Sequence, residues 1–251
     1  KNSWITLNGS LGEVYLNKLP LVQPKVKQNV LFNKFLNTIK KYSNSKVRTN
    51  ADTPKDAKQA ISLGATGIGL CRTEHMFFDS KRIIAMRKMI VAKNLEDRQI
   101  ALNELLPYQQ KDFYQILKSM DGKPVTIRLL DPPLHEFLPT EKRKINLLAK
   151  KLNISRIKLE EIIESLHESN PMLGHRGCRL AVTYPEITQM QTAAIVKATE
   201  KLIKNGYDPK PEVMIPLVGS MGEFIDQKNI VQKTINTMSN KQLNIKIGTM
   251  I

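Results

Sequence analysis

The chain has 251 residues, 41% of them hydrophobic, which is enough to build one large α/β domain or two small ones and excludes a disordered polymer. Lysine and arginine outnumber aspartate and glutamate by 39 to 23, which gives a net charge of +16 at pH 7 and a bias toward anionic ligands. Specific nucleic-acid binding is disfavoured, because the basic residues are scattered among Glu and Asn and the aromatic residues, at 6%, do not interleave with a basic stripe.

Two short strands, at residues 4–7 and 13–16, are the first predicted elements, and the Gly-rich turn between them makes a β-hairpin. Because a lone hairpin is not stable, we interpret residues 1–22 as the end of a preceding domain. Residues 23–46, with a proline near their start and a helical pattern after it, are predicted to be a linker. The main domain is predicted to cover residues 47–251.

Beyond residue 46, apolar strand patterns alternate with amphipathic helical patterns. Strands are predicted at residues 47–51, around Ile68 and Leu70, at 124–131, 212–218 and 246–251, with a short strand or turn at the end of the loop 170–180. Helices are predicted at residues 54–63, 80–93, 141–152, 155–168, 185–204 and 222–239, and residues 95–119 are predicted to form two helices separated near Pro107.

About six strand–helix alternations predict an α/β fold of the (β/α)8 TIM-barrel type, in which about six of the eight βα units are present. Charged or glycine-rich strand ends favour the same interpretation. A doubly wound open sheet is the alternative. It is disfavoured because no glycine-rich dinucleotide fingerprint opens the first helix of the main domain.

Three arginines lie at or just after predicted strands, and therefore at one mouth of the barrel: Arg72, Arg128 and Arg176. A guanidinium offers a fork of donors that suits phosphate or carboxylate, and three converging cations are costly unless anions neutralise them. The residues alone leave two interpretations open. The anion is a small substrate with a phosphate and a carboxylate, or it is a structural partner among Glu74, Asp131 and Glu136.

Histidines follow the same strand ends, at His75, His135 and His175, but the arginine-rich surroundings disfavour a bound cation there. The two cysteines, Cys71 and Cys178, lack the spacing of a disulfide framework or a zinc site. Cys71 is predicted to pack in the core, and Cys178 lies nearer the predicted site without a paired base. These cysteines fit a reducing, cytoplasmic compartment, with an organelle such as a glycosome or plastid left open. No apolar run approaches the ~20 residues of a membrane span.

Four long motifs resemble the pyruvate, phosphate dikinases, within the wider family of phosphoenolpyruvate-utilising enzymes, and the resemblance extends over essentially the whole chain. The motifs are VRTNADTP at residues 47–54, GIGLCRTEHMFF at 67–78, TIRLLDPPLHEF at 126–137 and NPMLGHRGCRL at 170–180. The residues that follow Arg72 and Asp131 favour this dikinase over two alternatives, pyruvate, water dikinase and the enzyme I of the sugar phosphotransferase system.

The resemblance implies a phosphotransferase that interconverts ATP, pyruvate and phosphate with AMP, phosphoenolpyruvate and pyrophosphate. Residues 1–22 would be the end of a swivelling domain that carries a phosphohistidine, and residues 47–251 most of the phosphoenolpyruvate/pyruvate-binding barrel. Arg72 and Arg128 match arginines that grip the transferring phosphoryl group, and Arg176 matches a third arginine of that substrate site.

The resemblance further implies Mg²⁺, an ATP-grasp domain in the same parent chain and a homodimer, with no membrane or nucleic-acid partner. The Mg²⁺ carboxylates and the proton-donating cysteine would follow Ile251, and the phosphorylated histidine would precede residue 1. No metal ligand and no complete catalytic apparatus is therefore expected within these residues, which are predicted to be inactive alone. A polyanion-binding domain and a regulatory or assembly barrel without activity stay open as other classes of function.

Overall fold

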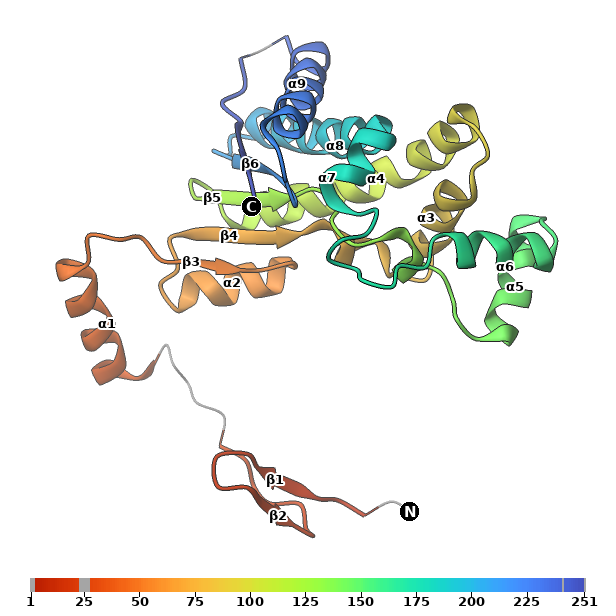
Figure 1. Ribbon diagram of the computed structural model, residues 1–251. Coiled ribbons are helices and arrows are strands. Elements are labelled where there is room, and N and C mark those ends of the chain that lie inside the picture. The colour runs from red at the N-terminus through yellow and green to blue at the C-terminus, as the bar shows by residue number, and fades with distance from the viewer. Residues whose placement is uncertain (1–2, 23–27, 241, 251) are drawn as a thin grey trace. The chain divides into compact units, whose positions relative to one another are not determined.

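The computed structural model describes residues 3–22, 28–240 and 242–250. The chain divides into two compact units, Lys1–Asn44 and Ser45–Ile251, both traced in Figure 1. Three parts of the predicted elements lie outside the described residues. They are the first two residues of the predicted domain end, residues 23–27 of the predicted linker, and Ile251 at the end of the last predicted strand.

The described residues of the first unit include the predicted hairpin and a helix. Strands β1 (Thr6–Asn8) and β2 (Glu13–Tyr15) pair antiparallel, with Thr6 opposite Tyr15. Helix α1 (Val30–Tyr42) begins after Asn29, whose side chain accepts a hydrogen bond from the backbone N–H of Phe32, the usual way to satisfy a free N–H in a first turn. None of the residues of α1 is buried. The helical pattern of the predicted linker is thus a helix.

The second unit is built on a parallel sheet, which contains five strands among the described residues. In spatial order these are β3 (Arg48–Asn50), β4 (Gly67–Arg72), β5 (Pro124–Arg128), β6 (Lys210–Ile215) and β7 (Lys246–Thr249). Each strand pairs with the next strand along the chain, so the winding never reverses. A doubly wound sheet reverses its strand order at a switch point, whereas a barrel does not. The α/β fold with an incomplete barrel and a short antiparallel hairpin is therefore confirmed.

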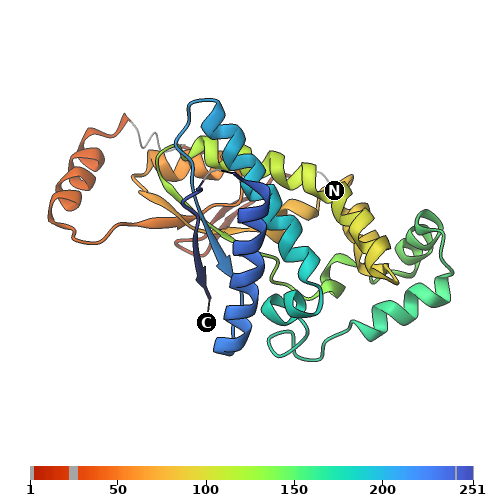
Figure 2. The same cartoon turned by 90° about the horizontal axis from the view of Figure 1, so that it is seen from above.

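The helices that connect the strands lie on the outside of the sheet. They are α2 (Pro54–Ser62), α3 (Arg82–Val91), α4 (Leu95–Ser119), α5 (Lys142–Leu152), α6 (Arg156–Ser165), α7 (Gly177–Thr183), α8 (Pro185–Lys204) and α9 (Met221–Met238), with short 3-10 turns η2 (Thr73–Phe77) and η3 (Leu134–Phe137) after β4 and β5. Helix α8 packs between α4 and α9, and both views show the three along the same side of the sheet (Figures 1 and 2).

Local signals place the helix ends where the sequence predicts them. The Thr53 hydroxyl accepts a hydrogen bond from the backbone N–H of Asp56, and Pro54 opens α2. Gly64 follows that helix with a φ of 96°, a left-handed conformation that glycine adopts without strain. Ser220 and Glu223 form a reciprocal capping box at the start of α9.

The predicted break near Pro107 is wrong, because α4 is a single helix of 25 residues with Pro107 inside it. A proline removes one helical hydrogen bond and costs about 3 kcal/mol in a helix interior. The buried face of α4 continues on both sides of the proline, from Leu102 and Leu105 to Phe113 and Leu117. Burying four such side chains contributes more than the lost hydrogen bond removes, at ~1.5–3 kcal/mol each, and so the helix continues.

The short strand or turn predicted at the end of the loop 170–180 is instead the start of helix α7. The backbone N–H of Cys178 donates to the carbonyl of Pro216, at 3.0 Å, but the residues after it bond along the helix rather than along a strand. Gly177 has a φ of 55°, and a Cβ there would lie 2.9 Å from the Cβ of Leu217. Among the described residues, the sheet therefore contains the other five predicted strands and no strand at this position.

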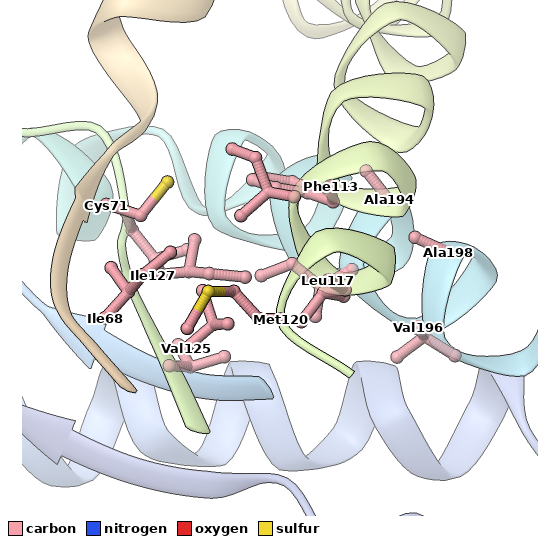
Figure 3. Packing of buried hydrophobic residues seen from close by; sticks show 14 of the residues in the cluster. Ile68, Cys71, Phe113, Leu117, Met120, Val125, Ile127, Ala194, Val196 and Ala198 are labelled. Carbon is pink, nitrogen blue, oxygen red and sulfur yellow. The ribbon is translucent and has the colours of Figure 1, made fainter. Parts of the chain in front are cut away.

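The core lies between the sheet and the helices α4 and α8, as Figure 3 shows. From the strands come Ile68, Cys71, Val125 and Ile127, and from the helical side come Phe113, Leu117, Met120, Ala194 and Ala198. The Cys71 side chain is fully buried there, which confirms its predicted packing role. Burial raises the pKa of the Cys71 thiol well above its usual value, so the group stays protonated.

Candidate functional site

The carboxyl ends of β4 and β5 bring two of the predicted arginines side by side. Arg72 is the last residue of β4 and Arg128 the last residue of β5, and their Cα atoms are register partners in the parallel pair. Side chains that follow parallel strands meet at one edge of a sheet. The strand pattern read from the sequence is thus sufficient to place these two guanidinium groups together.

Arg176 reaches the same edge by a different route, because it precedes helix α7 rather than ending a strand. The backbone N–H of Gly177 donates to the carbonyl of Asp131 at 2.9 Å, and the backbone N–H of Cys178 donates to that of Pro216 at 3.0 Å. These two bonds fasten the start of α7 to the segments that follow β5 and β6. The third arginine is therefore held at the strand ends by backbone contacts.

Asp131 joins two of the arginines directly. Its Oδ2 atom accepts a hydrogen bond from Nη2 of Arg176 at 2.6 Å and lies 3.0 Å from Nη1 of Arg128. Its backbone carbonyl also accepts from Nε of Arg176 at 3.1 Å. The Asp131 side chain is almost completely buried, so these bonds operate away from solvent, where charged hydrogen bonds are strong.

Two further carboxylates complete the pairing of the arginines. Glu74 accepts from Nη2 of Arg128 at 2.5 Å. Asp52 accepts from Nε and Nη2 of Arg72, at 3.0 and 2.6 Å, and from the backbone N–H of Arg72 at 2.8 Å. The hydrogen bonds to Asp52 raise the pKa of the Arg72 guanidinium above its usual value. We call Arg72, Arg128, Arg176, Asp52, Glu74 and Asp131 the strand-end cluster.

The structure thus shows that carboxylates neutralise the arginines. Two of these carboxylates are among the three that the sequence suggests. Glu74 and Asp131 act in this way, whereas Glu136 is exposed and takes part in no ion pair of the described residues. Asp52 is the partner that sequence reasoning missed. The signal was present, because Asp52 follows β3 just as Arg72 ends β4, and polar residues after strands collect at one edge.

Several polar atoms of this edge remain without a hydrogen-bond partner among the described residues. They are buried and belong to three charged groups and one hydroxyl: Glu74 Oε2, Arg128 Nε, Asp131 Oδ1 and Thr73 Oγ1. A buried polar atom left unsatisfied costs about 1–3 kcal/mol. The cluster therefore presents both donors and acceptors that a polar ligand would satisfy.

The histidines near the strand ends contact different elements. His75 Nε2 lies 4.0 Å from Oδ2 of Asp52, His135 Nδ1 lies 3.1 Å from the carbonyl of Leu166, and His175 Nε2 lies 2.8 Å from the Thr183 hydroxyl. Across residues 3–22, 28–240 and 242–250, no group of three or more His, Cys, Asp or Glu side chains could hold a metal ion.

Cys178 is buried close to the strand-end cluster, at the start of α7. Burial raises the pKa of its thiol to about 11. Its Sγ lies 3.9 Å from the carbonyl of Glu223, which can only accept a hydrogen bond. A thiol in this state is protonated at neutral pH and is a poor nucleophile.

None of the helices in residues 3–22, 28–240 and 242–250 combines the length and the apolar character that a membrane span requires.

Comparison with known proteins yields one family and a consistent set of relatives. The family model described as "PEP-utilising enzyme, PEP-binding domain" matches residues 26–251. The chain is 44% identical over 255 residues to a pyruvate, phosphate dikinase of Clostridium symbiosum and 47% identical over 257 residues to pyruvate, phosphate dikinase 2 of Oryza sativa subsp. japonica. It is 46% identical over 255 residues to a pyruvate, phosphate dikinase of Rhizobium meliloti (strain 1021). Each comparison covers 100% of this chain but only 28–29% of the relative.

Proposed function

The chain belongs to the family of PEP-utilising enzymes, and from this premise we propose that it supplies the phosphoenolpyruvate/pyruvate site of a pyruvate, phosphate dikinase. The proposed reaction interconverts ATP, pyruvate and phosphate with AMP, phosphoenolpyruvate and pyrophosphate. Arg72, Arg128 and Arg176 bind the phosphoryl group and carboxylate of the substrate.

The observation that carries this proposal is the strand-end cluster with its unsatisfied buried atoms. Arg128 offers a free Nε donor, and the neighbouring Glu74 and Asp131 each keep one free acceptor. A phosphate group or a carboxylate is the natural partner of the Arg128 fork, because both accept hydrogen bonds, whereas the free oxygens of Glu74 and Asp131 need a donor that such an anion does not supply. The cluster lies at the strand ends, where barrel enzymes bind their substrates.

The arrangement suits the charge movement of phosphoryl transfer to an enolate. In such a reaction, negative charge shifts between phosphoryl oxygens and the enolate oxygen, and preorganised cations lower the barrier. The side chains of Arg128 and Arg176 are only 12% and 15% exposed and are held in place by carboxylates. The side chain of Arg72 is 39% exposed and reaches solvent. All three arginines are thus held by carboxylates before the substrate arrives, and Arg72 is the most exposed of them.

The proposal extends to the parts that the resemblance implies. They are the swivelling phosphohistidine domain, to which residues 1–22 belong, a linker at residues 23–46, an ATP-grasp domain, a homodimer and Mg²⁺. The division of the chain at Asn44 and the start of the family match at residue 26 support a boundary between residues 22 and 46, and the 28–29% coverage of the relatives supports further domains in the parent chain. A reducing, cytoplasmic location is supported by two free, buried cysteines. The described residues do not form a metal site by themselves, so no step is assigned to the ion.

The test is isotope exchange between pyruvate and phosphoenolpyruvate, catalysed by the complete product of the gene. The wild-type protein is expected to catalyse the exchange, and the Arg128→Lys variant is expected to lose it by orders of magnitude, because an ammonium group cannot reproduce the guanidinium fork. The partial reaction in which ATP and phosphate give AMP, pyrophosphate and the phosphorylated enzyme should be unchanged. Normal pyruvate exchange in Arg128→Lys would reject the assignment of the site.

A further inference from the structure

Two glutamines are buried in the apolar interface between α4 and α8. Gln109 of α4 and Gln191 of α8 have no solvent exposure, and Nε2 of Gln191 donates to Oε1 of Gln109 at 3.3 Å. A buried amide is unfavourable unless its polar atoms are bonded, and a satisfied buried network fixes one arrangement of the groups around it. These glutamines are therefore expected to fix the position of the segments that they bond to.

Gln191 holds the backbone that leaves strand β5. The backbone N–H of Leu129 makes the last bond to the neighbouring strand, to the carbonyl of Met214 at 3.0 Å. The next N–H, that of Leu130, donates instead to Oε1 of Gln191 at 2.8 Å. A side chain on a helix thus replaces the adjacent strand as the acceptor, at the point where the chain turns out of the sheet.

The residue after Leu130 is Asp131, which contacts both buried arginines of the strand-end cluster. Its Oδ2 atom is shared by Arg128 and Arg176, and its carbonyl accepts from Nε of Arg176. The Leu130 N–H belongs to the peptide that joins Leu129 to Leu130, directly before the residue that carries this carboxylate. The hydrogen bond to Gln191 therefore fixes the backbone one residue before Asp131, without touching any charged group.

Gln109 links the same pair to the other carboxylate that binds Arg128. Its Nε2 lies 3.9 Å from Sδ of Met76, a weak contact to turn η2. That turn also carries Glu74, which accepts from Arg128. The two amides thus contact the backbone beside one carboxylate that binds Arg128 and a side chain of the turn that carries the other.

We propose that Gln191 is a positioning residue of the substrate site, which sets the orientation of Arg128 and Arg176 through Leu130 and Asp131, with Gln109 holding its amide. The proposal rests on the function proposed above. Gln191 itself does not touch the substrate. Its effect is on the transition state, because guanidinium groups displaced by a fraction of an ångström still bind an anion but match the moving charge less well.

The experiment compares Gln191→Met with Gln227→Met in the complete product of the gene. Methionine has a similar volume but lacks the strong acceptor and the donor. Gln227, on α9, is equally buried and accepts from the Thr188 hydroxyl, so it controls for the loss of a buried amide. Both variants should lower the thermal midpoint. Only Gln191→Met should lower kcat for phosphoenolpyruvate formation, by about 10- to 100-fold, with KM for pyruvate changed less than about threefold. Equal kcat values in the two variants would overturn the proposal.

Gln191→Glu is the rescue variant. A glutamic acid kept protonated by burial retains a carbonyl acceptor for the Leu130 N–H and an O–H donor for Gln109. It should recover kcat to within about tenfold of the wild type, and lose it as the pH rises and the buried acid ionises. A kcat as low as that of Gln191→Met at every pH would contradict the positioning role.

Arg128→Lys, measured in the same assays, separates this proposal from the one on which it rests. Wild-type turnover in Arg128→Lys would reject the substrate site itself and the positioning role with it. Loss of turnover in Arg128→Lys, together with matching kcat values for Gln191→Met and Gln227→Met, would reject the positioning role alone.

Discussion

Two arginine–carboxylate clusters occupy the same parallel sheet, and they differ in how completely they are bonded. The mid-sheet cluster consists of Arg48, Thr126 and Glu212. Arg48 donates to the Thr126 hydroxyl at 3.1 Å and to both Glu212 oxygens, at 2.5 and 3.3 Å, while the Thr126 hydroxyl donates to Glu212 at 2.8 Å. The side chain of Arg48 is 37% exposed, so its remaining donors reach solvent. At or beside the strand-end cluster, four buried atoms have no hydrogen-bond partner among the described residues.

The mid-sheet cluster is possible because of one glycine. Arg48 lies on β3, and its guanidinium crosses β4 to reach Thr126 on β5 and Glu212 on β6. Gly69 of β4 leaves room for the Arg48 side chain, because a Cβ at position 69 would lie only 3.2 Å from the Cβ of Arg48. Identical residue types thus serve two purposes. A cluster whose side chains bond to one another across strands holds the strands together. A cluster that contains buried atoms without a hydrogen-bond partner is suited to a ligand.

The two clusters would not differ in function if substitution of an arginine in either one changed the rate of phosphoenolpyruvate formation equally. Arg72→Lys, in the complete product of the gene, should reduce the rate of phosphoenolpyruvate formation by about 10²–10⁴-fold, because a single ammonium cannot form the two-pronged contact. Arg48→Lys should leave that rate within about threefold of the wild type. Steady-state kinetics of both variants measure this, and the contrast is lost if Arg48→Lys is equally inactive.

Asp131→Asn tests whether the strand-end cluster acts as one unit. The substitution removes the charge that Arg128 and Arg176 share, and leaves two buried guanidinium groups with less compensation. We expect kcat to fall by about 10- to 100-fold and the free energy of unfolding to fall by about 1–3 kcal/mol. Denaturant titration and kinetics on the same preparation measure the two effects. An unchanged kcat would mean that Asp131 stabilises the fold only.

Glu212→Gln should affect stability and its pH dependence but not turnover. Burial by itself raises the pKa of Glu212, but the hydrogen bonds from Arg48 and Thr126 outweigh it and hold the pKa below its usual value. A lowered pKa in the folded state contributes stability at a pH above the usual value of 4.5, and this contribution is lost as the pH falls below it.

The variant should therefore be less stable than the wild type by about 1–2 kcal/mol at pH 7, with the difference shrinking below about pH 4. Urea unfolding at a series of pH values measures this difference. A gap that widens in acid would show that the sign of the shift is wrong.

The smallest effects are expected at the two thiols, Cys71 in the core and Cys178 at the start of α7. Cys71→Ala, in the core near the sheet, should cost about 1–2 kcal/mol through lost packing. Cys178→Ala should leave pyruvate turnover unchanged, because the buried Cys178 thiol contacts the carbonyl of Glu223 rather than the arginines of the strand-end cluster. Thermal unfolding and kinetics check these expectations. A loss of solvent-proton exchange at the pyruvate methyl group in Cys178→Ala would identify Cys178 as the proton donor instead.

Local sequence was sufficient for most of the fold and for two of the three arginines. The start of α2 after Thr53, its end before Gly64 and the strand that ends in Arg72 depend on residues within a few positions of each other, and they lie where the sequence predicts them. Parallel strands then place Arg72 and Arg128 together, because consecutive carboxyl ends share one edge.

Contacts between segments far apart in the chain decided the rest. Helix α4 runs through Pro107 because its apolar face is buried on both sides of that residue, and the start of α7 is set by bonds to Asp131 and Pro216. Asp52 pairs with Arg72 across 20 positions, and Gln191 reaches Leu130 across 61. Helix propensity and helix capping depend on residues that are close together in the chain, so they can be predicted directly from the sequence. A buried hydrogen bond between distant segments has a partner only after the chain has folded, and so only the tertiary structure identifies it.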